Sequence, residues 1–243
     1  MPSVTPGSLS STRIPDTELP PESIRRRSQG SNPDPQLFLD IGRRCRDDMC
    51  RALESAAIDW TRFTDVLDFG CGCGRTLRWM ADQSTRWNLH GTDVDAEAVA
   101  WCQRHLPFAT CDVNGDLPPL RHADGAFDFI YALAVFTHLD RTREALWLQE
   151  LARITKPGGV VLLTVFGQHA AAALTLEQRV QLATTGMVFM HRPEWKGIYP
   201  DWFGLAYHTE AHVHESYGRF FDVQASHHRG LNNHLDLIVC RTR

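Results

Sequence analysis

Short apolar runs alternate with amphipathic segments through the middle of the chain. The apolar runs span residues 65–69, 88–94, 108–113, 127–135 and 158–166. The amphipathic segments between them include residues 74–87, 96–105 and 142–154, which have the spacing of helices. This alternation predicts a parallel sheet with helices on both faces. The run "GGVVLLTVF" is apolar at nearly every position, as expected of a strand buried on both faces.

The pattern changes near the C-terminus. Residues 218–243 contain two β-rich runs joined by Gly230 to Asn233, which leaves no room for a crossover helix, so this pair must be antiparallel. Residues 34–58 carry an imperfect helical stripe, interrupted at Gly42, that predicts a helix packed on the main domain. We therefore predict an α/β fold with a doubly wound, mostly parallel seven-stranded sheet that ends in an antiparallel hairpin.

The length of 243 residues suits one main domain, which we place at residues 36–243. Residues 1–35 hold seven of the thirteen prolines, and we predict that they form a flexible N-terminal arm. The alternative is that the later part of the arm, "PPESIRRRSQGSN", folds over a site as a lid. Residues 167–208 form an insertion before the terminal hairpin.

Composition narrows the classes of partner. The formal net charge of −4 argues against broad nucleic-acid binding, which depends on clustered Lys and Arg. No apolar run approaches the ~20 residues that cross a bilayer, and the N-terminus lacks the apolar core of a signal peptide, so we expect a cytoplasmic protein without a membrane partner. Two lysines against twenty-three arginines suggest a GC-rich bacterial source.

The sequence does not predict a metal site. The seven cysteines are odd in number and scattered, which favours reduced thiols over a disulfide framework. Cys71 and Cys73 resemble a ligand pair, but no second pair of metal-binding spacing follows. His208 and His212 lie one helical turn apart, yet no matching acidic ligand is evident from spacing.

The candidate chemistry lies in "VLDFGCGCGR", residues 66–75. Glycines at 70, 72 and 74 allow a sharp turn after a strand and a close approach of a ligand to the main chain. Three consecutive strands end in the acids Asp68, Asp93 and Asp112, which share one edge of a parallel sheet. The dinucleotide pattern G-x-G-x-x-G fails in both frames because Arg75 and Leu77 replace its last glycine, and no G-K-[ST] of a P-loop follows.

The motif D-x-G-x-G-x-G does fit, and over about residues 60–243 the chain resembles the class I S-adenosylmethionine-dependent methyltransferases. The resemblance implies S-adenosyl-L-methionine as cofactor, with its methionine part on the glycine loop, its ribose at the acid ending strand two and its adenine at the acid after strand three. A small residue near the end of strand four would face the methionine amino group. The implied cofactor-binding residues are Asp68, Gly70, Cys71, Gly72, Gly74, Asp93, Val94, Asp112, Val113, Tyr131 and Ala132.

Catalysis in such a family needs little more than alignment, because the sulfonium methyl is already electrophilic. A hydroxyl acceptor needs a general base, whereas a carboxylate or a neutral amine needs none. His138 and His208 are the candidate catalytic residues, although packing or support of the cofactor loop is an alternative role for His138. The aromatic residues of the insertion would shape an acceptor pocket or build a satellite core; they are Phe189, Trp195, Tyr199, Trp202, Phe203 and Tyr207.

The expected function is methyl transfer from S-adenosylmethionine to oxygen or nitrogen of a small-molecule acceptor, in secondary metabolism. A nucleic-acid partner is not expected, and the oligomeric state is left open. Two alternatives belong to other classes. One is a non-catalytic, methyltransferase-like binding protein, and the other is a nicotinamide-dependent oxidoreductase, which Arg75 and Leu77 disfavour.

Overall fold

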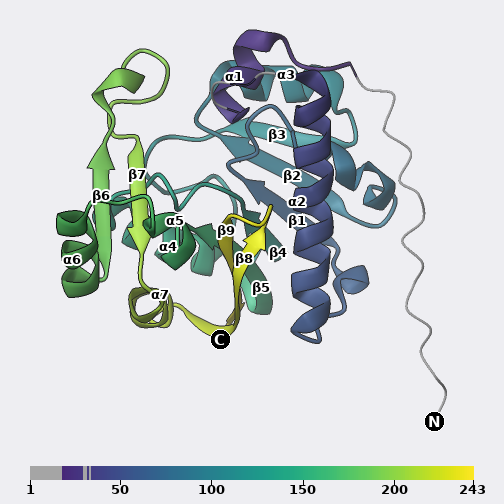
Figure 1. Ribbon diagram of the computed structural model, residues 1–243. Helices are drawn as coiled ribbons and strands as arrows, with labels where there is room; N and C mark the ends of the chain where they lie inside the picture. Colours follow the sequence, from purple (N-terminus) through teal and green to yellow (C-terminus); the bar gives the residue numbers. More distant parts are fainter. Residues whose placement is uncertain (1–17, 30–31, 33) are drawn as a thin grey trace.

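A seven-stranded sheet forms the centre of the computed structural model, which describes residues 18–29, 32 and 34–243 (Figure 1). Its strands are β1 (Asp65–Phe69), β2 (Asn88–Asp93), β3 (Ala109–Val113), β4 (Phe127–Ala132), β5 (Thr155–Val165), β8 (Phe221–Leu231) and β9 (Leu235–Thr242). The strand order is β3-β2-β1-β4-β5-β9-β8. The first five strands in this order pair in parallel, and β9 pairs antiparallel with both β5 and β8. The predicted mostly parallel sheet with a terminal hairpin is confirmed.

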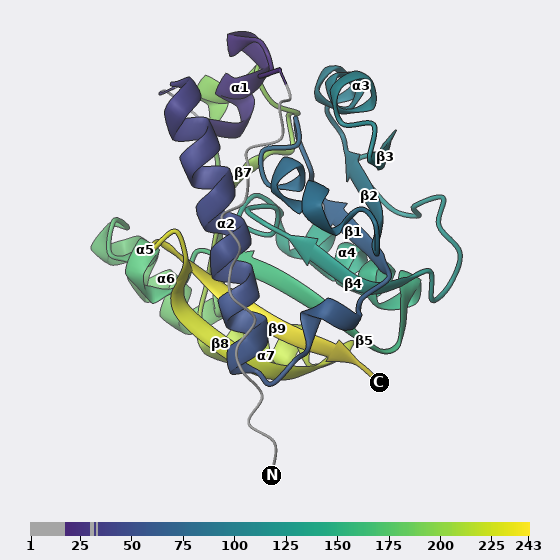
Figure 2. The ribbon, with the colours of Figure 1, turned by 90° about the vertical axis from the view of Figure 1, so that its right-hand side faces the viewer.

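Helices cover both faces of the sheet, and Figure 2 shows α2 crossing one of them. That face also carries η2 and α3, whereas α4 and α7 pack on the opposite face. Side chains alternate between the two cores along each strand, with Val66 on the α2 side and Leu67 on the α4 side. The helices that cover the sheet are α2 (Pro35–Ser55), η2 (Leu77–Gln83), α3 (Ala96–His105), α4 (Arg141–Ile154) and α7 (Glu210–Tyr217), and the short η1 (Trp60–Arg62) precedes β1.

Aspartates set where the main helices begin. Asp34 caps α2 by accepting the amide hydrogen of Leu37, and Pro35 occupies the first turn. Asp95 caps α3 and Asp140 caps α4 in the same way. The amphipathic segment 74–87 forms a 3₁₀ helix, η2, rather than a long α-helix. Gly42 does not interrupt α2, which continues through it.

Part of the predicted N-terminal arm is a helix, α1 (Glu22–Gln29), whose Ile24 belongs to the same apolar cluster as Ala98 and Trp101 of α3. Arg27 of α1 forms ion pairs with Asp95 at 2.5 Å and with Glu97 at 2.7 Å. Residues 1–17, 30, 31 and 33 of the arm lie outside the described residues. Whether the arm as a whole is flexible therefore stays a prediction.

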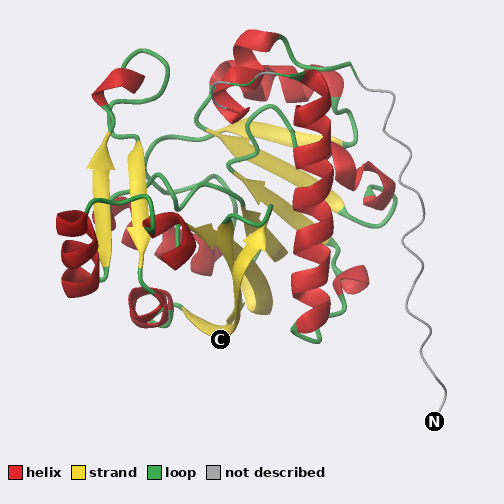
Figure 3. Cartoon of the chain, viewed as in Figure 1, coloured by secondary structure: helices red, strands yellow, loops and turns green. Residues whose placement is uncertain are grey.

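The segment 167–208 forms a small unit beside the main sheet (Figure 3). Its two strands pair antiparallel and, with the helices, enclose a satellite core that includes Leu182, Val188 and Tyr207. The elements of this unit are α5 (Gln168–Ala171), α6 (Leu176–Thr185), β6 (Met187–His191), η3 (Pro193–Trp195) and β7 (Gly204–His208). Across the described part of the chain, helices long and apolar enough for a membrane span are absent.

Candidate active site

A cavity of about 680 Å³ opens where the parallel strands β1, β2 and β4 end. This is the edge at which ligands bind in open α/β sheets. One part of the lining, called the polar end, includes the glycine loop, Asp68 in β1 and Asp93 at the end of β2. The other end is apolar and aromatic, and its lining includes Leu139, Trp147, Ile198, Tyr199, Trp202 and Phe203. The two ends therefore suit chemically different groups.

The glycine loop adopts a backbone that other residues rarely adopt. Gly70, Gly72 and Gly74 have φ values of +81°, +51° and +73°. A Cβ on Gly70 would lie 2.3 Å from Cγ2 of Val135, so a side chain there would also collide with the loop after β4. The amides of Gly70 and Cys71 both donate to the carbonyl oxygen of Thr92, at 2.8 and 3.0 Å, and so fasten the loop to β2.

Asp93, which ends β2, holds the loop from its other side. Its Oδ2 accepts the amide hydrogen of Gly72 at 2.7 Å, and its Oδ1 accepts that of Asp95 at 2.8 Å. Burial raises the pKa of Asp93, although the hydrogen bonds from the two amides favour the charged form. Each carboxylate oxygen keeps a second lone pair for a ligand hydroxyl.

Asp68 is a buried carboxyl at the polar end of the cavity, with 3% of its surface exposed. Burial raises its pKa well above the ordinary range, and the neighbouring Tyr131 only partly offsets this effect. Among the ion pairs of the described residues, none involves Asp68. A buried carboxylate without a cationic partner is costly, so this end of the cavity fits a ligand that carries positive charge. S-adenosylmethionine, with its sulfonium and ammonium groups, is such a ligand.

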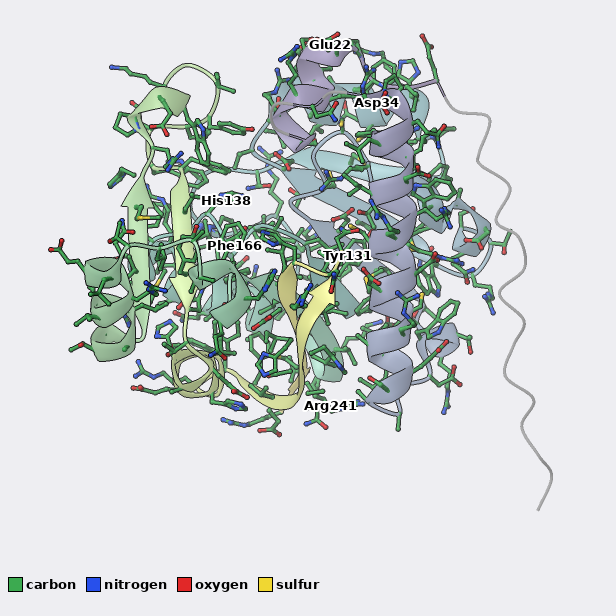
Figure 4. All side chains as sticks on the ribbon, viewed as in Figure 1. Glu22, Asp34, Tyr131, His138, Phe166 and Arg241 are labelled. Atoms are coloured by element: carbon green, nitrogen blue, oxygen red, sulfur yellow. The ribbon has the colours of Figure 1, made fainter. Side chains whose placement is uncertain are left out.

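His138 stands at the aromatic end, beside β7 (Figure 4). Its ring stacks on Phe203 with centroids 4.1 Å apart, and its Nδ1 donates to the carbonyl oxygen of Gly204 at 2.8 Å. Burial lowers the pKa of His138 to about 4. The imidazole is therefore neutral near pH 7, with the proton on Nδ1 and a free lone pair on Nε2.

Two segments from distant parts of the sequence meet over the cavity. The Tyr199 hydroxyl donates to the carbonyl oxygen of Arg27 at 3.1 Å. Arg75, which follows the glycine loop, donates from Nη1 to the carbonyl oxygen of Ser28 at 2.6 Å. Arg27, Ser28 and Tyr199 all belong to the cavity lining. Helix α1 and the segment between η3 and β7 therefore both contribute to the wall of the cavity.

The cavity brings together many of the sequence-predicted cofactor residues. Those in its lining are Asp68, Gly70, Cys71, Gly72, Asp93 and Val94. Gly74 lies just behind the loop, where Leu106 and Cys102 approach it. Asp112 and Val113 are exposed at the end of β3, and the lining includes Asn114 instead.

The residues at the end of β4 that line the cavity differ from those predicted. Tyr131 and Ala132 are fully buried in the two cores, whereas Leu133, Ala134 and Val135 line the cavity. The strand thus continues to Ala132 before the chain turns to the site. Of the aromatic residues noted in the insertion, Tyr199, Trp202 and Phe203 line the cavity and Tyr207 belongs to the satellite core.

His208 does not reach the cavity, so the geometry offers no place for the predicted catalytic role. It is 1% exposed, and its Nε2 lies 2.6 Å from Oε2 of Glu144. His212 places its Nε2 2.7 Å from Oε1 of the same carboxylate. Sequence spacing did not reveal Glu144 as their acidic partner because it lies in α4, far from both histidines in the chain.

Comparisons with known proteins agree with this geometry. Residues 66–159 match the family model described as methyltransferase domain. A malonyl-[acyl-carrier protein] O-methyltransferase of Pectobacterium atrosepticum is 34% identical over 110 residues, which cover 45% of this chain and 42% of that protein. A 2-methyl-6-phytyl-1,4-hydroquinone methyltransferase of Synechocystis is 29% identical over 111 residues, covering 44% of this chain and 33% of that protein. The chain thus spans less than half the length of these curated relatives.

A solved S-adenosylmethionine-dependent methyltransferase of Methanosarcina mazei superposes with a TM-score of 0.55 at 24% identity, covering 73% of this chain and 92% of the other. Sheet order, terminal hairpin and glycine loop define a Rossmann-like methyltransferase fold. Residues 66–159 thus match a methyltransferase domain, and the chain has the fold of solved S-adenosylmethionine-dependent methyltransferases.

Proposed function

We propose that the protein transfers a methyl group from S-adenosylmethionine to oxygen or nitrogen of a small acceptor that is apolar or planar. The observation that carries this proposal is that one cavity is lined both by the glycine loop with the buried Asp68 and the half-buried Asp93, and by aromatic rings with a neutral histidine. The relative from Synechocystis is named for a phytyl-hydroquinone acceptor, which supports an apolar, planar group at the aromatic end. The relative from Pectobacterium is named for O-methylation of a malonyl group, which supports oxygen as the accepting atom.

The residues at the polar end would hold the cofactor. When bound, S-adenosylmethionine supplies an electrophilic methyl group on its sulfonium sulfur. Gly70 and Gly72 let the cofactor approach the backbone. Burial raises the pKa of Asp68 well above its ordinary range, and a cationic ligand beside this carboxyl would favour its charged form. Asp93 accepts hydrogen bonds from ribose hydroxyls while it keeps the loop in place. Asn114 is the polar side chain of the lining that follows β3.

The aromatic end would orient the acceptor and exclude water. Tyr199, Trp202 and Phe203 offer flat surfaces for an apolar or planar group. Nε2 of His138 accepts the proton of an acceptor hydroxyl, because Nδ1 is already committed to Gly204. The cover formed by α1 and Tyr199 limits access of solvent to the reacting groups.

Ligand-dependent thermal unfolding tests the cofactor assignment. At one hundred times its dissociation constant a ligand adds about 2.7 kcal/mol, roughly 5 to 10 °C for a domain of this size. We expect shifts with S-adenosylmethionine and S-adenosylhomocysteine but not with NADH. Asp93→Ala should weaken cofactor binding by about 1 to 3 kcal/mol, whereas the exposed Asp112→Ala serves as control. A shift with NADH alone would instead favour an oxidoreductase.

A panel of acceptors tests the reaction. Radiolabelled S-adenosylmethionine is offered with phenols, quinols, fatty acids and aromatic amines, and product is extracted into organic solvent. We expect transfer to at least one apolar acceptor of these classes. Cofactor binding without transfer to any of them would favour a non-catalytic methyltransferase-like protein.

A further inference from the structure

Three buried thiols converge beneath the glycine loop, and we infer that they form a binding site for a soft metal ion such as Zn²⁺. The three-thiol cluster consists of Cys71 in the glycine loop, Cys102 in α3 and Cys111 in β3. Their Sγ atoms all lie within 4.8 Å of one another, and all three residues are buried. The cluster shares Cys71 with the lining of the large cavity, but this inference does not depend on the proposed function.

The backbone makes room for the three sulfur atoms. Gly91 lies in the middle of β2, where glycine weakens a strand and often marks a close approach. A Cβ at this position would lie 3.0 Å from Sγ of Cys71 and 3.2 Å from Sγ of Cys111. The missing side chain thus leaves the space that the sulfur atoms occupy.

The chemistry of the cluster suits a thiophilic ion. Thiolates select Zn²⁺ and other soft ions, and a Zn–S bond of about 2.3 Å puts neighbouring sulfurs of a tetrahedral site about 3.8 Å apart. The Sγ atoms, which lie within 4.8 Å of one another, need to approach by only about 1 Å to reach that spacing. The carbonyl oxygen of Gly72 lies 3.4 Å from Sγ of Cys102 and 3.6 Å from Sγ of Cys71, close enough to complete the coordination. Binding of one divalent ion by three thiols releases three protons to solvent and leaves a complex of charge −1.

An ion has a route to the cluster because Cys71 belongs to the lining of the large cavity. Cys73, the neighbour suggested by sequence spacing, points elsewhere: its Sγ lies 3.5 Å from Oγ of Ser28 and packs in another apolar cluster. The metal partners of Cys71 are therefore residues of α3 and β3 rather than its neighbour in the loop.

A second group of three potential ligands in the described residues, Glu144 with His208 and His212, suits a cation less well. Each Nε2 is already satisfied by one carboxylate oxygen. The guanidinium of Arg141 lies 3.3 Å from Nδ1 of His212 and would repel a cation. The thiols of Cys71 and Cys102 both contact the carbonyl oxygen of Gly72, and the buried Arg78 lies near enough to Cys102 for its charge to favour the thiolate.

Cadmium titration of the reduced, metal-free full chain tests the site. Thiolate-to-cadmium charge transfer gives a near-ultraviolet band, and competition with a chelator gives the affinity. We expect one equivalent of Cd²⁺ in the wild type and in Cys240→Ala, which removes a buried thiol outside the cluster. Cys111→Ser and Cys102→Ser should each weaken binding at least tenfold.

Absence of the band in the wild type, or equal binding by the wild type and both cluster variants, would overturn the proposal. Circular dichroism checks that each variant is folded. If the cluster variants do not fold, X-ray absorption of the zinc-loaded wild type decides the question. Three sulfur neighbours at about 2.3 Å support the site, and coordination by nitrogen and oxygen alone rejects it.

Discussion

His138 donates its Nδ1 hydrogen to the carbonyl oxygen of Gly204 at a distance of 2.8 Å. A carbonyl oxygen only accepts, so this contact fixes the neutral tautomer whose Nε2 is the acceptor. Gly204 begins β7, and His138 follows β4, so a residue of the segment 167–208 determines which ring nitrogen of His138 carries the proton.

Replacing the imidazole of His138 by another aromatic ring should distinguish a role in proton transfer from a role in packing. His138→Phe keeps an aromatic ring against Phe203 but removes Nε2. For a hydroxyl acceptor we expect kcat to fall by about 10²- to 10⁴-fold, the usual contribution of a general base. Affinity for S-adenosylmethionine, measured by calorimetry, should stay unchanged. An unaltered kcat would show that His138 only packs.

The same histidine should make stability depend on pH. Its pKa is about 4 in the folded protein and 6.5 ordinarily, so the unfolded chain takes up the proton first as pH falls. Its contribution is fully present above about pH 6.5 and is lost as pH falls towards 4. The loss amounts to about 2 kcal/mol between pH 7.5 and 5. Urea unfolding should show a drop of this size in the wild type that His138→Phe lacks.

The ion pairs of Arg27 should matter for cofactor retention. Arg27 ties α1 to Asp95 and Glu97 at the start of α3, and its carbonyl oxygen receives the Tyr199 hydroxyl. Arg27→Ala should therefore raise the Kd for S-adenosylmethionine about three- to tenfold, because the cover over the cavity loosens. Arg26→Ala is the matched control, since Arg26 only pairs with Glu22 on the exposed side of the same helix. Similar Kd values for both variants would argue against a closing role.

The fold followed from the sequence because its signals are local. Val66 and Leu67 alternate between two cores, and a run such as residues 158–166 is apolar at nearly every position because both faces of β5 are covered. The glycine loop could be predicted from the sequence for the same reason, because a backbone with positive φ favours glycine at each position separately.

The site was less predictable because it joins residues that are far apart in the chain. Spacing pointed to Cys73 as the partner of Cys71, whereas the fold brings Cys102 and Cys111 to it. Glu144 is 64 residues from His208, so no helical or strand period connects them. The first residue after β4 that lines the cavity is Leu133, whereas the sequence placed this role at Tyr131 and Ala132. The difference arises because the last residue of a strand depends on its pairing with neighbouring strands.

Glu144 joins α4 to both ends of the turn between β7 and α7, and its replacement should loosen this junction. Glu144→Gln keeps the shape but offers one acceptor and one donor where two histidine nitrogens need acceptors. We expect a loss of about 1 to 3 kcal/mol in urea unfolding at neutral pH. The exposed Glu215→Gln, which breaks only a surface pair with Arg219, should cost less than about 0.5 kcal/mol. Equal free energies of unfolding for the two variants would show that Glu144 does not stabilise this junction.

The pH dependence of Glu144 provides a second measure of the same junction. Burial alone would raise its pKa, but the hydrogen bonds from His208 and His212 outweigh burial and lower the pKa from 4.5 to about 2. A carboxyl whose folded pKa is depressed stabilises the fold above its unfolded pKa, and that stability disappears as pH falls from about 4.5 towards 2. The wild type should lose stability over this window more steeply than Glu144→Gln, because the amide does not titrate. Parallel curves for the two proteins would mean that the histidines do not hold the carboxylate in its charged form.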